Sequence, residues 1–229
     1  MSEAEQPPGI DTRSLIARIY IRGHGIEIGA LHVPLEIPET AEVRYIDRLP
    51  VDELRKQYPE LDSFGLVDVD IIDEGEVLHA VADRSQDFVI ANHFLEHCQN
   101  PFDAMRNMLR VLRPGGYLYM AIPDKRFTFD IDRPVTTIEH IRRDFEEGPG
   151  WSKRAHFEEW ARLVNKAGDE SAVQERADSL IDINYSIHFH VWTQVEMLEM
   201  LMAAGELLPF EIVVMLRNGI EVIFVLEKL

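Results

Sequence analysis

Short apolar runs alternate with amphipathic stretches along the first half of the chain. Residues 87–91 (Asp-Phe-Val-Ile-Ala) contain a continuous apolar run after Asp87, which is typical of a strand buried on both faces. In residues 101–112 the apolar side chains recur every three or four positions, which predicts an amphipathic helix that begins near Pro101. Strands that alternate with helices or loops predict a parallel sheet. Further strands are expected at residues 25–30, 43–47, 67–72 and 117–122.

The pattern changes after Pro123. Residues 124–187 are rich in charged side chains and contain no strand-like run. Helices are expected there at residues 137–147 and 156–166. We therefore expect residues 124–187 to form a largely helical insertion on the side of the sheet where a substrate would bind.

The end of the chain returns to strand-like patterns. A helix is expected at residues 193–204, with Thr193 as its N-cap. The pair Asn218-Gly219 then separates two apolar runs, and it is typical of the tight turn that joins antiparallel strands. We therefore predict one α/β domain over residues 1–229, with a doubly wound, mostly parallel sheet that ends in an antiparallel hairpin.

The first residues of the chain carry no apolar core. Residues 1–10 are acidic and contain proline, so we expect them to be disordered and do not expect a signal peptide. A helix is expected at residues 11–20, with Asp11 as its N-cap. The longest apolar runs fall short of the roughly 18 residues of a membrane-spanning helix. We expect a cytoplasmic protein that does not enter a membrane.

The composition argues against nucleic acids and anionic membranes as binding partners. The formal net charge is −18, and such an acidic surface repels nucleic acid and anionic membranes. Cys98 is the only cysteine, so neither an intrachain disulfide nor a cluster of thiolate metal ligands can form. The sequence leaves the oligomeric state open.

Two strand ends carry residue types that bind an adenosine-type cofactor in doubly wound sheets. Glu27-Ile28-Gly29 ends the first expected strand, and Asp47 ends the second. Glycine lets the backbone approach a ligand closely, and an acid at the second position can accept hydrogen bonds from two ribose hydroxyls. A nicotinamide-type fingerprint would need its glycines after the first strand, whereas Gly23 and Gly25 precede it.

Further motifs resemble the class I S-adenosylmethionine-dependent methyltransferases (methyltransferase type 11-like). Residues 85–97, which end in Leu-Glu-His, and residues 109–116, which end in Arg-Pro-Gly-Gly, match that family, as do Glu27-Ile28-Gly29 and Asp47. The resemblance covers roughly residues 20–123 and 190–229 and implies a seven-stranded, Rossmann-like sheet. Leu31 stands where the family usually has a second glycine, so we expect a different backbone path there.

The resemblance also implies how S-adenosylmethionine would be bound. Asp47 would hold the ribose hydroxyls, and Asp73 would face the adenine amino group. A solvated loop acid is an equally good interpretation of Asp73, because Asp70 and Glu74 compete with it for the aligned position. The remaining cofactor positions lie near the methionyl group and the sulfonium: Glu27, Gly29, Ala30, Asn92 and His93.

Methylation of an alcohol also requires the hydroxyl proton to be removed, by a base or at a metal-bound oxygen. Histidine suits the role of base because its unperturbed pKa is about 6.5. His140 follows the fifth strand and lies one helical turn before Asp144, which could orient its ring, so we rank it first. His188 and His190 rank behind it.

Other roles for the histidines stay open. His188 and His190 alternate on an extended segment, so their rings point to the same side and could bind a divalent metal such as magnesium. Each of them, and His140, fits equally well a role in packing and hydrogen bonding. We expect His97 to be a structural cap, and His156 to lie in packing or at the surface.

The resemblance extends to a bacterial subgroup of methyltransferases associated with glycan assembly, on residues 123–160. It implies an O-methyltransferase that acts on a saccharide hydroxyl, with a mannose-type oligosaccharide as one candidate. Two alternatives remain: a small-molecule methyltransferase of secondary metabolism, and a methyltransferase-like scaffold that binds its cofactor or a partner without turnover.

Overall fold

The computed structural model describes residues 11–229, so the disorder expected for residues 1–10 lies outside the described part of the chain. One sheet of seven strands forms its centre, in the order β3-β2-β1-β4-β5-β7-β6. All neighbouring strands are parallel except β7, which runs antiparallel to β5 and β6. This is the predicted doubly wound, Rossmann-like sheet with a C-terminal antiparallel hairpin. The strands are β1 (Gly23–Ile28), β2 (Ala41–Asp47), β3 (Ile71–Ile72), β4 (Gln86–Asn92), β5 (Leu112–Pro123), β6 (Phe210–Asn218) and β7 (Glu221–Lys228).

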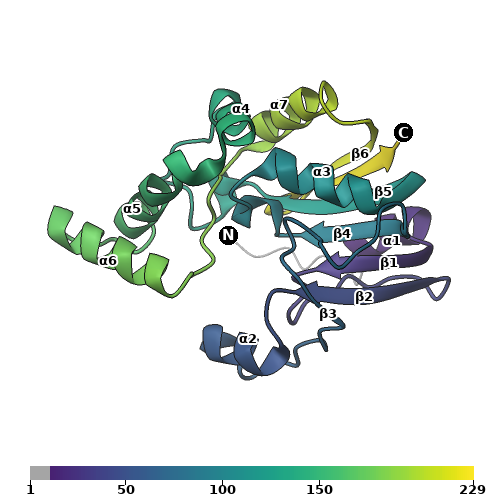
Figure 1. Cartoon of the computed structure of the whole chain (residues 1–229), viewed down its shortest axis with the longest axis horizontal. Coiled ribbons are helices and arrows are strands. Elements are labelled where there is room, and N and C mark those ends of the chain that lie inside the picture. Colours follow the sequence, from purple (N-terminus) through teal and green to yellow (C-terminus); the bar gives the residue numbers. More distant parts are fainter. Residues whose placement is uncertain (1–10) are drawn as a thin grey trace, which may run out of the picture.

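Helices cover both faces of the sheet and extend beyond it (Figure 1). Short 3-10 turns at Pro59–Leu61, Leu95–His97, Lys125–Phe127 and Pro149–Trp151 complete the regular structure. None of the helices within residues 11–229 is long and apolar enough to cross a membrane. The helices are α1 (Thr12–Tyr20), α2 (Val51–Gln57), α3 (Pro101–Val111), α4 (Ile138–Glu147), α5 (Lys153–Leu163), α6 (Glu170–Asp182) and α7 (Gln194–Gly205).

The two faces of the sheet pack against different helices. On one face, α3 and α7 contribute Phe102, Met105 and Met200 to the largest buried apolar cluster. The opposite face packs against α1, through Ile16 and Ala17. The insertion has a third, separate core between α5 and α6, which explains why these helices can project from the sheet (Figure 1).

Helix caps fix where several elements begin. The Asp11 side chain accepts hydrogen bonds from backbone N–H groups of α1, as its acidic type at that position predicts. Thr193 and Glu196 form a capping box at the start of α7, in which each side chain satisfies a backbone donor of the other residue. The segment before α7 is therefore held in a defined direction.

Three elements differ from the sequence expectation. β3 is limited to Ile71–Ile72, because the residues before it bond to the loop after β1 and to Tyr45 instead of forming a regular ladder. The ladder of β5 begins at Leu112, and residues 113–116 bulge out of it before pairing resumes at Tyr117. Helix α6 lies in a charged stretch where the sequence indicated no separate helix.

Candidate cofactor-binding and active site

Two adjoining cavities open at the carboxyl ends of β1, β2 and β4. The first cavity has a volume of about 240 Å³ and is lined by Asp47, Glu74 and Tyr185, among others. The second cavity has a volume of about 380 Å³ and includes Glu27 and Asn92 in its wall. Ligands of doubly wound sheets bind outside the carboxyl ends of the strands, so both cavities lie where a cofactor is expected. The two cavities share Gly29, Leu31, His93 and His97.

The turn after β1 separates the two cavities. Gly29 has a φ of 66° and Leu31 a φ of 50°, both in the left-handed region. Leu31 therefore adopts the kind of conformation that a glycine adopts readily, at the position where the family usually has its second glycine. A Cβ on Gly29 would come no closer than 3.9 Å to another side chain, which indicates that backbone conformation, not crowding, calls for glycine there. Ala30, which the sequence analysis named as a cofactor position, lines the second cavity.

Asp47 lies at the end of β2 in the wall of the first cavity. Its carboxylate accepts a 2.7 Å hydrogen bond from the Arg48 backbone N–H, and burial raises its pKa. Asp73 is not among the residues that line either cavity. Its two carboxylate oxygens accept hydrogen bonds from the backbone N–H groups of Glu74 and Ala80, and Glu74 lines the cavity in its place.

Glu27 of β1 and Asn92 of β4 line the second cavity from neighbouring, paired strands. Both Glu27 oxygens accept from the Leu35 N–H, at 3.0 and 3.2 Å, and burial raises the pKa of Glu27 to about 7. The amide oxygen and nitrogen of Asn92 are buried, and neither has a hydrogen-bond partner within residues 11–229. Such a buried, unsatisfied amide is costly unless a ligand supplies the partner. These residues therefore fit a polar cofactor in the second cavity.

His93 belongs to both cavities and is held by a residue that the sequence analysis did not single out. Its Nε2 lies 2.7 Å from Oε2 of Glu221, and Glu221 also pairs with Arg13 of α1. Burial alone would raise the pKa of Glu221, but hydrogen bonds from Arg13, His93 and Asn218 lower it to about 2. An acid directly before the apolar run of β7 was the available sequence signal.

His188 is hydrogen-bonded to a buried acid. Its Nδ1 lies 2.7 Å from Oδ2 of Asp130, and the other Asp130 oxygen accepts from Arg133 at 2.9 Å. His188 lines the second cavity, as does His97. The His97 Nδ1 faces the Ile187 carbonyl at 2.9 Å, and burial lowers the pKa of His97 to about 3. His97, expected as a structural cap, thus also contributes a ring to the cavity wall.

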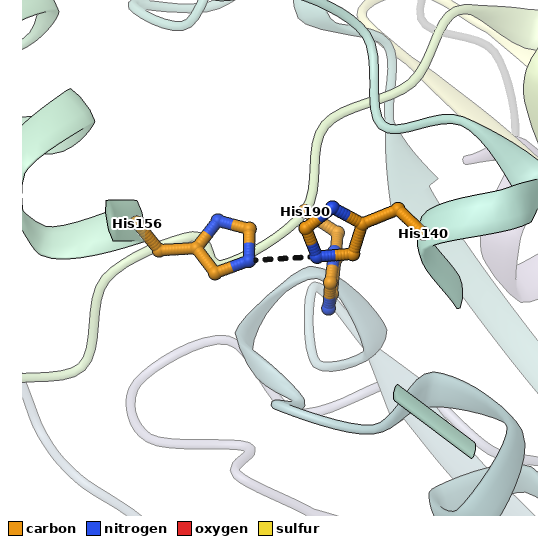
Figure 2. A group of neighbouring side chains, drawn as sticks. All are labelled: His140, His156 and His190. Carbon is orange, nitrogen blue, oxygen red and sulfur yellow. Dashed lines mark hydrogen bonds between the residues drawn. The ribbon is translucent and has the colours of Figure 1, made fainter. Parts of the chain in front are cut away.

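The other expected catalytic residues form a separate cluster. His140, Asp144 and His190 gather with His156, and none of the four is among the residues that line the two cavities. Figure 2 shows the rings of His140 and His156 facing each other, with Nε2 atoms 3.1 Å apart. Burial, followed by the neighbouring His140, lowers the pKa of His156 to about 4.

Two groups of side chains have the spacing of metal ligands. His140, His156 and His190 form one, and Glu96, His97 and His188 form the other. His188 and His190 therefore belong to different groups, whereas the alternation in sequence suggested a shared site. The two histidines separate because each packs against a different part of the protein. His188 lies beside Asp130, whereas His190 lies beside His140 of α4 and His156 of α5.

Comparison with known proteins finds a methyltransferase-like segment in the part of the chain that carries the ends of β2 and β4. Residues 43–120, from β2 into β5, match the family model described as a methyltransferase domain. Residues 43–120 therefore resemble a methyltransferase domain. The family implies S-adenosylmethionine as the methyl donor, and the strand order is that of the class I fold. A search of curated proteins finds no match.

Solved structures show the same fold at low sequence identity. A S-adenosylmethionine-dependent methyltransferase from Methanosarcina mazei aligns with a TM-score of 0.53 and 16% identity, over 96% of this chain and 99% of that chain. A protein from Pyrococcus horikoshii aligns with a TM-score of 0.50 and 16% identity, over 91% of this chain and 82% of that chain. The methyltransferase fold therefore extends over nearly the whole described chain.

Proposed function

We propose that this methyltransferase transfers a methyl group from S-adenosylmethionine to a hydroxyl group of a saccharide, with mannose-type oligosaccharides as the first class to test. The observation that carries the proposal is the His188–Asp130 pair in the wall of the second cavity. A histidine oriented by a buried carboxylate is the arrangement expected of a general base that acts on a hydroxyl.

The cofactor would occupy the two cavities together. Asp47 would accept hydrogen bonds from the ribose hydroxyls, while Glu27 would face the methionyl amino group and Asn92 would satisfy its free amide. The turn at Gly29 and Leu31 would pass between them, close to the ligand. When bound, S-adenosylmethionine supplies a methyl group made electrophilic by the positive charge on its sulfur.

His188 would accept the hydroxyl proton. Its Nδ1 donates to Asp130, so the proton sits on Nδ1 and Nε2 keeps a lone pair for the substrate. Arg133 balances the buried charge of Asp130 and also donates to the backbone carbonyl of His188, at 2.8 Å. The ring is thereby held in one orientation and one tautomer. A positioned base of this kind contributes roughly 10²- to 10⁴-fold to the rate.

Aromatic surface beside the base supports a saccharide. The Phe129 ring is 56% exposed, and its centroid lies 4.9 Å from that of His188. Trp160 packs edge-on against Phe129, with ring centroids 5.4 Å apart. An exposed aromatic ring supported in this way can pack against the apolar face of a sugar ring, while polar groups nearby contact its hydroxyls.

Magnesium is the less favoured route to proton removal. In the wall of the second cavity the imidazole of His97 packs edge-on against that of His188, with ring centroids 4.6 Å apart. Magnesium prefers oxygen ligands in octahedral geometry, whereas imidazole nitrogens suit other divalent metals. We therefore assign proton removal to the base and expect activity to persist when magnesium is omitted.

The test combines cofactor binding with turnover. Calorimetric titration of S-adenosylhomocysteine should show binding that Asp47→Ala weakens by about tenfold to a hundredfold, because hydrogen bonds to a charged group contribute roughly 1.5–3 kcal/mol. Asp52→Ala, which removes an exposed acid from α2, should bind as the wild type does. Formation of S-adenosylhomocysteine is then measured with a panel of saccharides and non-sugar alcohols, with and without magnesium.

The base is tested in the same assay. His188→Gln should lower kcat by roughly 10²- to 10⁴-fold and leave S-adenosylhomocysteine affinity near wild type. His79→Gln, at an exposed histidine, should change neither value. Turnover restricted to non-sugar alcohols would favour the secondary-metabolism alternative, and binding without any turnover would favour the scaffold. A folded wild type that binds no S-adenosylhomocysteine would refute the proposal as a whole.

A further inference from the structure

We propose that His140, Asp144, His156 and His190 form a binding site for a transition metal of the zinc class, separate from the active site. These four residues are called the histidine cluster below. The site lies where the helical insertion meets the segment before α3, at Gln99 and Asn100, and the segment before α7. It does not depend on the identity of the methylated substrate.

The distances within the histidine cluster match those between ligands of a single ion. The His140 Nε2 lies 3.1 Å from the His156 Nε2 and 3.3 Å from Oδ2 of Asp144. The His190 Nε2 lies 3.6 Å from the same oxygen. Ligand atoms about 2.0–2.2 Å from a tetrahedral zinc ion are about 3.3–3.5 Å apart. One ring nitrogen from each of the three histidines lies within 4.8 Å of the other two. Figure 2 shows the three rings gathered together.

Burial and charge also favour a cation. Asp144 and His190 are fully buried, and His156 is 9% exposed. Within residues 11–229 the Asp144 carboxylate pairs with no lysine or arginine, and its Oδ2 has no hydrogen-bond donor. A buried carboxylate without a cationic partner is strongly unfavourable. A divalent cation at the centre of the histidine cluster would supply that partner.

The sequence places the four ligands on elements that can converge. His140 and Asp144 are one turn apart on the same side of α4, and His156 follows near the start of α5. The Ser152 hydroxyl donates to Oδ1 of Asp144 at 3.1 Å, which leaves Oδ2 directed at the histidines. Hydrogen bonds of this kind orient metal ligands in known sites.

The ligand types indicate which metal is bound. Three imidazole nitrogens and one carboxylate oxygen suit zinc and its first-row neighbours, whereas calcium and magnesium take oxygen ligands. Four protein ligands fill a tetrahedral coordination sphere and leave no open position for a substrate. The ion would therefore join α4 and α5 to the segment that carries His188, and hold that segment in place.

Metal content of the purified full-length protein tests the proposal. Elemental analysis after dialysis against zinc and removal of free metal should give about one zinc per chain. His140→Gln and His156→Gln should each lose most of that zinc, while His97→Gln and the exposed-site variant His79→Gln should keep it. His156→Cys should retain zinc, because thiolate is also a zinc ligand. Replacement by cobalt should give the visible absorption of tetrahedral cobalt in the wild type and not in His140→Gln or His156→Gln.

Thermal unfolding gives a second, independent measurement. A chelator should lower the Tm of the wild type and leave the Tm of His156→Gln unchanged, since ligand binding to the folded state stabilises it. Two results would overturn the assignment. One is a folded wild type that binds no zinc and whose Tm responds to neither zinc nor chelator, which would make the histidine cluster a hydrogen-bonded network only. The other is loss of zinc in His97→Gln with retention in His156→Gln.

Discussion

Glu27 is a buried acid whose ionisation should be visible in the pH dependence of stability. Its pKa is raised by burial from 4.5 to about 7. Between these pH values the folded protein holds a proton that the unfolded chain releases, so the free energy of unfolding falls as the pH rises through this window. A shift from 4.5 to about 7 corresponds to on the order of 3 kcal/mol.

Urea unfolding of the wild type and of Glu27→Gln measures this contribution. Glutamine keeps an oxygen for the Leu35 N–H but cannot ionise. We expect the difference in stability between variant and wild type to shift in favour of the variant between about pH 5 and about pH 8, because only the wild type must ionise a buried group. A difference that stays constant with pH would show that Glu27 ionises in the folded protein as it does in the unfolded chain.

The sequence predicted which strand ends carry the candidate site, but it did not predict which side chains there pair with one another. Glu27, Asp47 and Asn92 follow recognisable strand ends, and parallel strands bring their carboxyl ends to one edge of the sheet. Side-chain pairs from distant positions leave no such pattern. His188 meets Asp130 across 58 positions of the sequence, and His93 meets Glu221 across 128. Their partners depend on the packing of the insertion and of β7.

The histidines show the same contrast between local patterns, which a sequence reveals, and long-range contacts, which it does not. Alternation placed His188 and His190 on one side of an extended segment, which is a local property. The residues that face each ring depend on where α4 and α5 pack, and this packing is determined by contacts between distant parts of the chain. His140 and Asp144 were expected to meet because both lie on one helix face, and they do, at 3.3 Å.

At the scale of elements, α1 is attached to the sheet by a partly buried ion pair between Arg13 and Glu221. Arg13 donates to Glu221 through Nε at 2.7 Å, and a second guanidinium nitrogen also contacts that carboxylate. On the same helix, Arg18 pairs with Glu36 where both side chains are exposed. Arg13→Ala leaves the Glu221 charge without its main partner and should cost about 3 kcal/mol, while Arg18→Ala should cost below about 1 kcal/mol.

Denaturant unfolding of the two variants at neutral pH tests this comparison. Both remove an arginine from α1, so helix propensity and net charge change equally in the two proteins. Equal destabilisation would mean that the Arg13 pair contributes no more than an exposed pair. Because Glu221 also contacts His93, Arg13→Ala should in addition weaken S-adenosylhomocysteine binding.

Elements with strong patterns were predicted well, and elements with weak patterns were not. α3 and β4 carry long apolar periodicities, and both were predicted within two residues of their bounds. α6 buries only Val173, Ala177 and Leu180 among charged neighbours, so its apolar stripe is too narrow to be separated from its surroundings. The start of β5 was missed because a turn-forming sequence at residues 113–116 bulges within the strand.

At the scale of the whole molecule, the net charge of −18 should make stability depend on salt. Like charges on a folded surface repel one another more strongly than in the expanded chain, and salt screens that repulsion. Salt also weakens exposed ion pairs such as Arg154–Asp178, but each such pair contributes little. We therefore expect the Tm to rise by a few degrees between about 0.02 M and about 0.2 M sodium chloride.

A charge variant separates screening from other effects of salt. Glu146 and Glu199 are exposed, and neither takes part in an ion pair within residues 11–229. Replacing both with lysine reduces the excess of negative charge, so the double variant should have a higher Tm at low salt and a smaller rise with salt than the wild type. If the Tm falls with salt in both proteins, ion pairs outweigh repulsion over the molecule. An equal rise in both would assign the effect to general salting-out and not to charge.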